Sequence, residues 1–244
     1  MAKSSSKTRP WVPSIPNQTG GIPGSQHLSD LSSLWIIQEK DWSEEFKKWE
    51  PKSRFYITND KKENIYFVQE NSTGSDRFFW GKDREFTLNA VTESGEEVMQ
   101  FHRPHKTKAS FFSWMNTEAT GWQLQVLCPP NTPFGLIKQI DSNFHKRFAL
   151  LDAEGATRLN IKGPLFENQI LGEDITFTVY FGEKGDKKEA GKIIRKWSGF
   201  KKELLTDAQN YLIQVPREMP VAEKILLIGA TFLIEFMVYS NTDN

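Results

Sequence analysis

Cysteine is nearly absent from this chain of 244 residues, in which Cys128 is the single thiol. No disulfide can therefore form within the chain, and no cysteine-rich metal site is possible. The N-terminal stretch MAKSSSKTRPWVPSIP lacks the apolar core of a secretory signal peptide, and position 2 is not the glycine that N-myristoylation requires. We therefore expect residence in the reducing cytosol.

Net charge is also absent, because 31 Lys and Arg residues balance 31 Asp and Glu residues. A neutral chain is not a basic nucleic-acid binder as a whole, so no nucleic-acid partner is expected. The sequence contains no P-loop, GxSxG, HExxH or paired-cysteine pattern. Its four histidines are scattered, without the cysteines or clustered carboxylates that would complete a zinc site. The sequence therefore predicts a protein that is not an enzyme.

What the chain does contain is a long apolar run near its end, ILLIGATFLIEFMVY, from Ile225 to Tyr239, with Glu235 as its only charge. As a helix, this run would cover roughly 22 Å, which is shorter than the ~30 Å of a bilayer core. A helix that is apolar on every face must be buried in a protein core or in lipid. We predict an apolar helix over residues 221–240 that either fills a protein core or spans a membrane once.

The spanning alternative makes a prediction about orientation. Extending the run back to Val221 reaches a spanning length, although it takes in Glu223 and Lys224. Lysines 201, 202 and 224 precede the run and an aspartate, Asp243, follows it. That bias would leave most of the chain on the cytoplasmic side, as in a single-pass type II protein.

Proline, serine and glycine dominate residues 1–27, which we predict to be a disordered tail. Two overlapping PxxP patterns, built from Pro10, Pro13 and Pro16, fit a polyproline II ligand for SH3 or WW domains. The tail is therefore a candidate site for such a partner.

Short apolar strands separated by turn signals fill much of residues 28–240, which we predict to be one domain. The predicted strands are 34–37, 55–57, 65–68, 86–88, 98–101, 148–151, 159–161, 175–179 and 192–195. The stretch FTLNAVTESGEEVMQFHRP parallels ITFTVYFGEKGDKKEAGKIIRKW, and YITNDKKENIYFV parallels ALLDAEGATRLNIKG, which indicates a degenerate duplication. Paired strands and one apolar helix together favour a β-barrel closed around that helix.

Several motifs occur in an order that resembles the phospholipid scramblase family. They are EEVMQFHRP (96–104), VLCPPNTPFGLIKQ (126–139), LNIKGP (159–164), GKIIRKWSGF (191–200), TDAQNYLIQVP (206–216) and IGATFLIEFM (228–237). The resemblance implies a mainly β, Tubby-like fold, with a closed barrel of about twelve strands in two degenerate halves around a hydrophobic C-terminal helix.

The resemblance also implies an activity, the calcium-triggered, ATP-independent and bidirectional movement of phospholipids between membrane leaflets. The partners would then be phospholipids and a membrane surface, at the cytoplasmic face of the plasma membrane. The alternative is a membrane-associated or nuclear interaction module, in the cytosol or nucleus, without lipid translocation of its own.

This chain departs from the calcium-loop pattern of the family. The loop proposed for the family begins Asp-Ala-Asp-Asn-Phe-Gly, whereas this chain has Asp207-Ala-Gln-Asn-Tyr-Leu. The remaining ligands would be Asp207, Asn210, the backbone oxygen of Ile213, and Glu218. With fewer carboxylates and no glycine at the sharp turn, we expect calcium binding to be weak or lost. The competing interpretation is a loop or helix cap that leads into the last helix.

Two further segments are candidate sites. Where many family members carry a cysteine cluster, this chain has none, so we expect no palmitoyl anchor there. The replacing stretch is basic and aromatic, a composition suited to a membrane interface, or else to packing on the barrel; its candidate contacts are Lys106, Lys108, Phe111, Phe112 and Trp114. Lys192, Arg195 and Lys196 would be the charges of a nuclear import signal, or else one solvated face of a strand.

Overall fold

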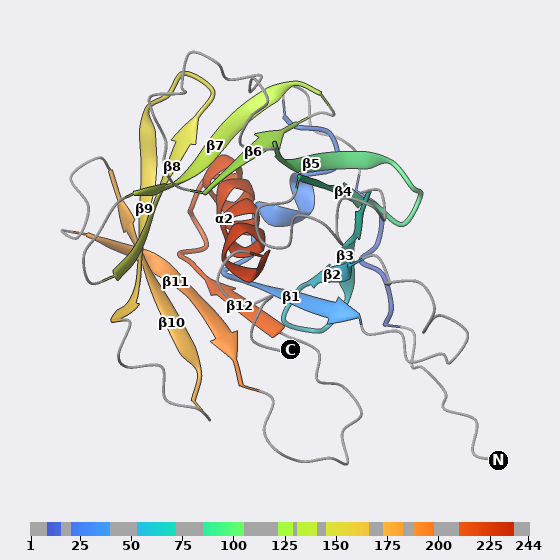
Figure 1. The fold of residues 1–244 in the computed structure, drawn as a ribbon. Coiled ribbons are helices and arrows are strands. Elements are labelled where there is room, and N and C mark those ends of the chain that lie inside the picture. The colour runs from blue at the N-terminus through green and yellow to red at the C-terminus, as the bar shows by residue number, and fades with distance from the viewer. Residues whose placement is uncertain are drawn as a thin grey trace, which may run out of the picture.

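The computed structural model describes residues 9–15, 21–39, 53–71, 85–104, 122–128, 131–140, 145–165, 173–182, 188–197 and 210–236. Within these ranges the chain forms one short 3-10 helix, twelve β-strands and one α-helix (Figure 1). In chain order they are η1 (Gln26–Leu28), β1 (Ser33–Glu39), β2 (Arg54–Thr58), β3 (Asn64–Glu70), β4 (Phe86–Val91), β5 (Glu97–Arg103), β6 (Gln123–Leu127), β7 (Pro133–Ile140), β8 (His145–Asp152), β9 (Thr157–Leu165), β10 (Ile175–Phe181), β11 (Glu189–Lys196), β12 (Asn210–Gln214) and α2 (Val221–Ile234).

The strands form a closed antiparallel barrel. Each strand pairs with the next one in the chain, and β1 pairs with β12 to complete the circle. In a strand with one buried face, successive side chains point alternately into the barrel and outward. In β4, for example, Phe86, Leu88 and Ala90 are buried, while the residues between them are partly exposed. The predicted fold class, a closed barrel of about twelve strands with one C-terminal helix, is confirmed.

The helix α2 lies inside the barrel (Figure 1), and every residue from Glu223 to Ile234 is buried. The structure thus shows the first of the two alternatives for the apolar run, a helix in a protein core. The helix ends at Ile234 and is followed by one wider turn at Glu235 and Phe236, while the rest of the predicted range to residue 240 lies outside the described residues. No helix in the described part of the chain has both the length and the hydrophobicity needed to cross a bilayer.

Aromatic rings and one glycine set how closely the helix approaches the wall. The Phe232 ring lies 5.2 Å from the ring of Phe55 and 5.2 Å from that of Phe101. A Cβ added at Gly229 would lie 3.0 Å from Ile137 and 3.2 Å from Val126. The glycine therefore allows the helix to sit against β5, β6 and β7 without a side chain between them.

The nine strands predicted from the sequence are all present, but three others were missed. These are β6, β7 and β12. The segments predicted to be duplicates form the hairpins β2–β3 and β8–β9, and β4–β5 and β10–β11; each contains a register shift beside its turn, as β6–β7 also does. Corresponding strands are six positions apart, which places them on opposite sides of the barrel.

Some described residues that precede the predicted domain boundary at residue 28 form hydrogen bonds to the barrel. The backbone of Asn64 bonds to the oxygen of Pro10 and the nitrogen of Val12, at 2.7 and 2.9 Å. The Tyr66 hydroxyl donates a 2.6 Å hydrogen bond to the oxygen of Gly24, which is buried. Composition alone indicated a tail, but backbone hydrogen bonds fix parts of this segment to the barrel.

Truncation of the helix core is the first test of this fold. We predict that Phe232→Ala lowers the free energy of unfolding by about 3–5 kcal/mol, because it leaves a cavity between the helix and two rings of the wall. Ile140→Ala, at a position that is 38% exposed, is the control and should cost less than about 1 kcal/mol. Urea unfolding followed by circular dichroism measures both; equal losses would contradict the packing.

Candidate functional site

The up-and-down strand order sorts the connections between strands to two ends of the barrel. One end, here called the hairpin end, holds the connections 59–63, 92–96, 128–132, 153–156 and 182–188. The other, here called the loop end, holds the connections 40–53, 71–85, 104–122, 141–144, 166–174 and 197–209. The helix α2 begins at the hairpin end and finishes at the loop end, where Phe236 stacks on Phe86 with ring centroids 4.5 Å apart.

Two candidate sites from the sequence belong to the loop end by their positions between strands. Lys106, Lys108, Phe111, Phe112 and Trp114 lie between β5 and β6, and Asp207 lies between β11 and β12. All six lie outside the described residues. The strands that flank these segments start or finish at the same end of the barrel, although the segments are far apart in the sequence.

The remaining candidate calcium ligands fall on a strand and on a turn. Asn210 and Ile213 belong to β12, which pairs with β1 and β11, whereas Glu218 follows β12 in the turn before α2. A strand extends by about 3.3 Å per residue, so the five residues of β12 place Asn210 and Gln214 about 13 Å apart. The structure therefore does not bring Asn210 and Glu218 together.

The three candidate import residues lie on β11, and they do not share one face. Lys192 and Lys196 lie on the side of the strand opposite to the buried Ile193. Each is close to a carboxylate: Lys192 lies 3.5 Å from Glu189, and Lys196 lies 2.6 Å from Asp174. Arg195 is two residues after Ile193 and therefore lies on the inward side of the strand, as Ile193 does. Because β11 is paired with β10 and β12, these charges do not form a free extended peptide.

The proline motif is partly described. Pro10 and Pro13 are exposed, and Trp11 between them forms an isolated parallel bridge with Asn64. Pro16 lies outside the described residues. The first PxxP pattern is therefore attached to the barrel by its backbone, while its two proline rings face outward.

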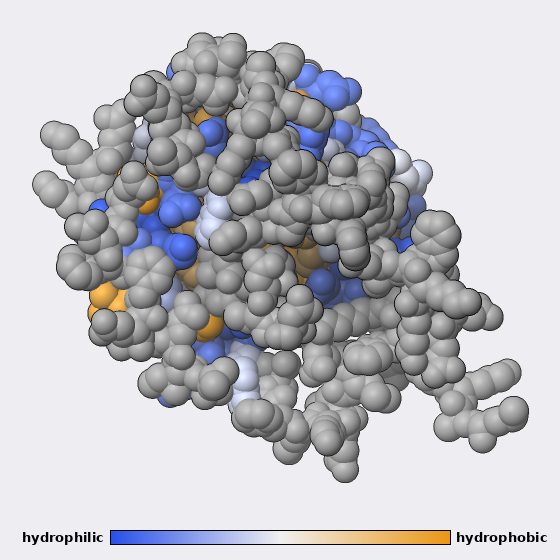
Figure 2. Space-filling view, in the orientation of Figure 1, coloured by the Kyte–Doolittle hydropathy of each residue, from blue (hydrophilic) through white to orange (hydrophobic). Residues whose placement is uncertain are grey.

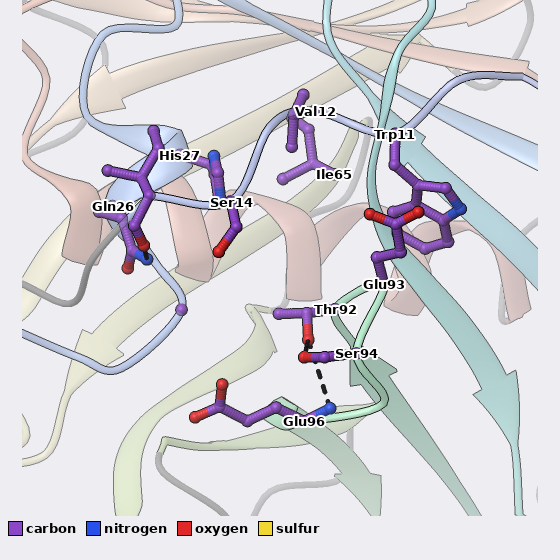
Figure 3. Close-up of a pocket in the computed structure, with 12 residues that line it drawn as sticks. Trp11, Val12, Ser14, Gln26, His27, Ile65, Thr92, Glu93, Ser94 and Glu96 are labelled. Atoms are coloured by element: carbon purple, nitrogen blue, oxygen red, sulfur yellow. Dashed lines mark hydrogen bonds between the residues drawn. The ribbon is translucent and has the colours of Figure 1, made fainter.

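A groove of about 300 Å³ lies between this N-terminal segment and the hairpin end (Figure 3). Trp11 and Glu93 line one side, His27 and Gln26 the other, and Thr92, Ser94 and Glu96 of the β4–β5 turn lie below them. Burial lowers the pKa of His27. The described residues contain no group of three or more His, Cys, Asp or Glu that could hold a metal ion.

Polar side chains inside the barrel anchor the helix, and their roles were not predicted from the sequence. The ammonium group of Lys224 donates hydrogen bonds to the backbone oxygens of Leu28, Ser29 and Arg217, at 2.9, 2.8 and 3.0 Å. Lys224 is fully buried, and burial lowers its pKa, while Asp30 and Glu218 oppose that shift. The lysine thus joins the start of α2 to η1 and to the turn that precedes the helix.

Two carboxylates of the helical segment are fixed as well. Glu223 is buried and accepts hydrogen bonds from Arg158 of β9, at 2.8 Å from Nη2 and 3.2 Å from Nε. Glu235 at the other end accepts a 2.7 Å hydrogen bond from the buried hydroxyl of Tyr211. The helix is therefore attached to the barrel at both ends, by groups that would have to separate if it left.

The single thiol is buried too. Cys128 follows β6 and is 4% exposed, and burial raises the pKa of its thiol to about 12. Thiolate is the nucleophile in cysteine chemistry, and it is rare at neutral pH for such a group. Cys128 is therefore poorly placed to accept a modifying group while the barrel is folded.

A closed antiparallel barrel of twelve strands that encloses one apolar helix is the class of fold that these observations define. A family model described as Scramblase matches residues 14–241 of the chain. The chain belongs to the scramblase family.

Individual relatives agree with that assignment. The chain is 29% identical to phospholipid scramblase 1 of Mus musculus over 235 residues, which cover 96% of this chain and 69% of the relative. It is 30% identical to phospholipid scramblase 2 of Homo sapiens, over 96% of this chain and 76% of the relative. It is 29% identical to phospholipid scramblase family member 5 of Homo sapiens, over 99% of this chain and 88% of the relative. No solved structure matches the chain.

The buried lysine gives the second test. We predict that Lys224→Met lowers the free energy of unfolding by about 1–3 kcal/mol, because the backbone oxygens of Leu28, Ser29 and Arg217 lose their donor. Lys61→Met, in the exposed turn between β2 and β3, is the matched control and should change stability by less than about 0.5 kcal/mol. Chemical denaturation of both variants checks this, and a stable Lys224→Met protein would show that the lysine is dispensable.

The buried thiol of Cys128 gives the third test of the structure. We predict that iodoacetamide modifies Cys128 slowly in the folded protein at pH 8 and rapidly in urea, since both burial and the raised pKa keep the thiolate rare. Mass spectrometry of the alkylated protein follows the reaction. Complete modification of the folded protein within minutes would contradict the burial of Cys128.

Proposed function

We propose that this protein is a membrane-associated scramblase that promotes ATP-independent, bidirectional movement of phospholipids between leaflets, at the cytoplasmic face of the plasma membrane. The observation that carries this proposal is that the family match covers most of the chain, from residue 14 to residue 241. The substrate class, phospholipids, is the one that the names of the relatives contain.

The barrel limits how such a protein could act. Its interior is filled by α2 and by the inward side chains of the strands, so it offers no path for a lipid. Leaving the barrel would separate Lys224 from three carbonyl oxygens and Glu223 from Arg158. We therefore propose that the folded barrel acts on the bilayer from its outer surface and its loop end, with the helix in place.

We further propose that this activity depends little on calcium. Gln209 and Leu212 stand where the family's loop has a carboxylate and a glycine, which weakens calcium coordination. The position of Asn210 and Ile213 on a strand paired on both sides supports the same view. Any binding should be on the order of 10⁻³ M or weaker.

Membrane attachment without a thioester-linked acyl chain completes the proposal. It rests on the burial of Cys128, the chain's single thiol. The basic and aromatic side chains of residues 106–114 are candidates for contact with the interface.

A second candidate is an interaction module, in the cytosol or nucleus, without lipid translocation of its own. One observation favours it, the enclosure of α2, since a barrel whose apolar helix is covered needs no membrane to stay folded. The outward-facing Pro10 and Pro13 would then be the place to look for an SH3 or WW partner.

Reconstitution into vesicles with a fluorescent phospholipid separates the two candidates. We predict that dithionite quenches fluorescence beyond the outer-leaflet fraction, at a similar rate with calcium and with EGTA, and that Asp207→Ala leaves the rate unchanged. Protein-free vesicles and vesicles with the heat-unfolded protein are the controls. Absence of quenching beyond the outer leaflet would favour the interaction module, and a micromolar calcium requirement abolished by Asp207→Ala would contradict the account of the loop.

A further inference from the structure

A row of basic side chains crosses the outer face of β7 to β11. The pairing registers place Ile140 beside Arg147, Arg147 beside Lys162, Lys162 beside Thr178, and Thr178 beside Lys192. Thr178 alternates with the buried Phe177 and Val179, so it points outward, and its cross-strand neighbours point the same way. Three cations therefore lie on one outward row across four adjacent strands.

Large apolar side chains are exposed beside this row. Ile140, Leu165 and Trp197 are 38%, 43% and 45% exposed, and each stands at or just beyond the loop end of its strand, β7, β9 and β11 respectively. In Figure 2, hydrophobic and hydrophilic atoms lie side by side on the left of the view, where Figure 1 places β9 to β11. Exposed aliphatic and tryptophan side chains bordered by cations are typical of a surface that binds to a membrane interface.

Basic side chains outnumber carboxylates among the described residues of this face. Its described residues include five basic side chains and three carboxylates: Lys138, Arg147, Lys162, Lys192 and Lys196 against Glu173, Asp174 and Glu189. The loop end of β1 to β5 differs, because its described surface charges are the carboxylates of Glu39 and Glu85 against the guanidinium group of Arg54, while Glu70 and Arg103 are buried. Among the described residues, cations therefore outnumber carboxylates on this face, and this balance favours its approach to an anionic surface.

We infer that the outer face of β7 to β11 docks the barrel on a bilayer that contains anionic phospholipids. The cations meet the headgroups, and Ile140, Leu165 and Trp197 enter the interface. This inference rests on the proposed function, in which phospholipid membranes are the partner. A nucleic acid would also satisfy the cations, but it gives no reason for three exposed apolar side chains at the strand ends.

Vesicle sedimentation tests the inference on the full-length protein. The vesicles are phosphatidylcholine alone, or phosphatidylcholine with phosphatidylserine, at low and high salt. The charge variant is Lys162→Glu with Lys192→Glu, and the apolar variant is Ile140→Ser with Leu165→Ser. The matched control, Lys61→Glu with Arg217→Glu, reverses two exposed charges at the hairpin end, where Arg217 is 66% exposed.

The expected results follow from the electrostatics of anionic membranes. The parent protein should bind the phosphatidylserine vesicles, bind phosphatidylcholine far more weakly, and lose affinity as salt rises. Each basic residue near such a surface contributes about a fivefold gain, so the charge variant should bind at least about tenfold more weakly. The control should stay within about twofold of the parent. If the charge variant does not fold, Lys162→Gln with Lys192→Gln replaces it.

The position of Trp197 gives an independent readout. Tryptophan emission should shift to shorter wavelength when the protein binds vesicles, and Trp197→Phe should reduce that shift. Unchanged vesicle affinity of the charge variant, or no binding of the parent to anionic vesicles, would overturn the inference. Binding of a single-stranded oligonucleotide through Lys162 and Lys192, without vesicle binding, would also overturn it.

Failure of this inference is distinguishable from failure of the proposed function. A protein that docks through this face and moves no lipid in the dithionite assay would retain the docking surface and lose the scramblase proposal. A protein that moves lipid, and whose charge variant binds vesicles as the parent does, would retain the function and lose the docking surface.

Discussion

An apolar helix with charged groups at its ends can stay in water only if something covers its faces and satisfies those charges, and the barrel does both. The inward side chains of the strands cover α2 from Glu223 to Ile234. Lys224 and Glu235 find hydrogen-bond partners at opposite ends of the barrel, in backbone oxygens and in the Tyr211 hydroxyl. Unpaired, such buried groups would cost several kcal/mol each, so closure of the sheet and insertion of the helix depend on one another.

This dependence governs what the protein can do at a membrane. A helix inserted in lipid would leave the strands without their core and would carry Glu223 and Lys224 away from their partners. In the proposed function, the folded barrel therefore acts through its outside, on the basic face of β7 to β11 and at the loop end, where the connections 104–122 and 197–209 leave the strands. Lipid movement by such a protein would come from disturbance of the bilayer at this surface, because the interior is already filled.

Much of the fold could be predicted from the sequence, because period-2 alternation and turn residues mark most of the strands. The strands that were missed have weaker local signals: β6 is short, β7 contains Pro133 and Gly135, and β12 was interpreted as part of a calcium loop. The anchors of the helix could not be predicted, since Lys224 bonds to residues almost two hundred positions away. The basic row could not be predicted either, because Arg147, Lys162 and Lys192 become neighbours only through strand register.

The central claim is that the helix stays inside the barrel while the protein is on a membrane, and hydrogen–deuterium exchange tests it most directly. Amide exchange would be measured with and without phosphatidylserine vesicles, for peptides that cover 225–234 and for the strands between 123 and 151 that pack on the helix. The account predicts that both sets keep the protection they have in the free protein. Loss of protection in these strands on binding, while the helix peptides remain protected by lipid, would contradict it.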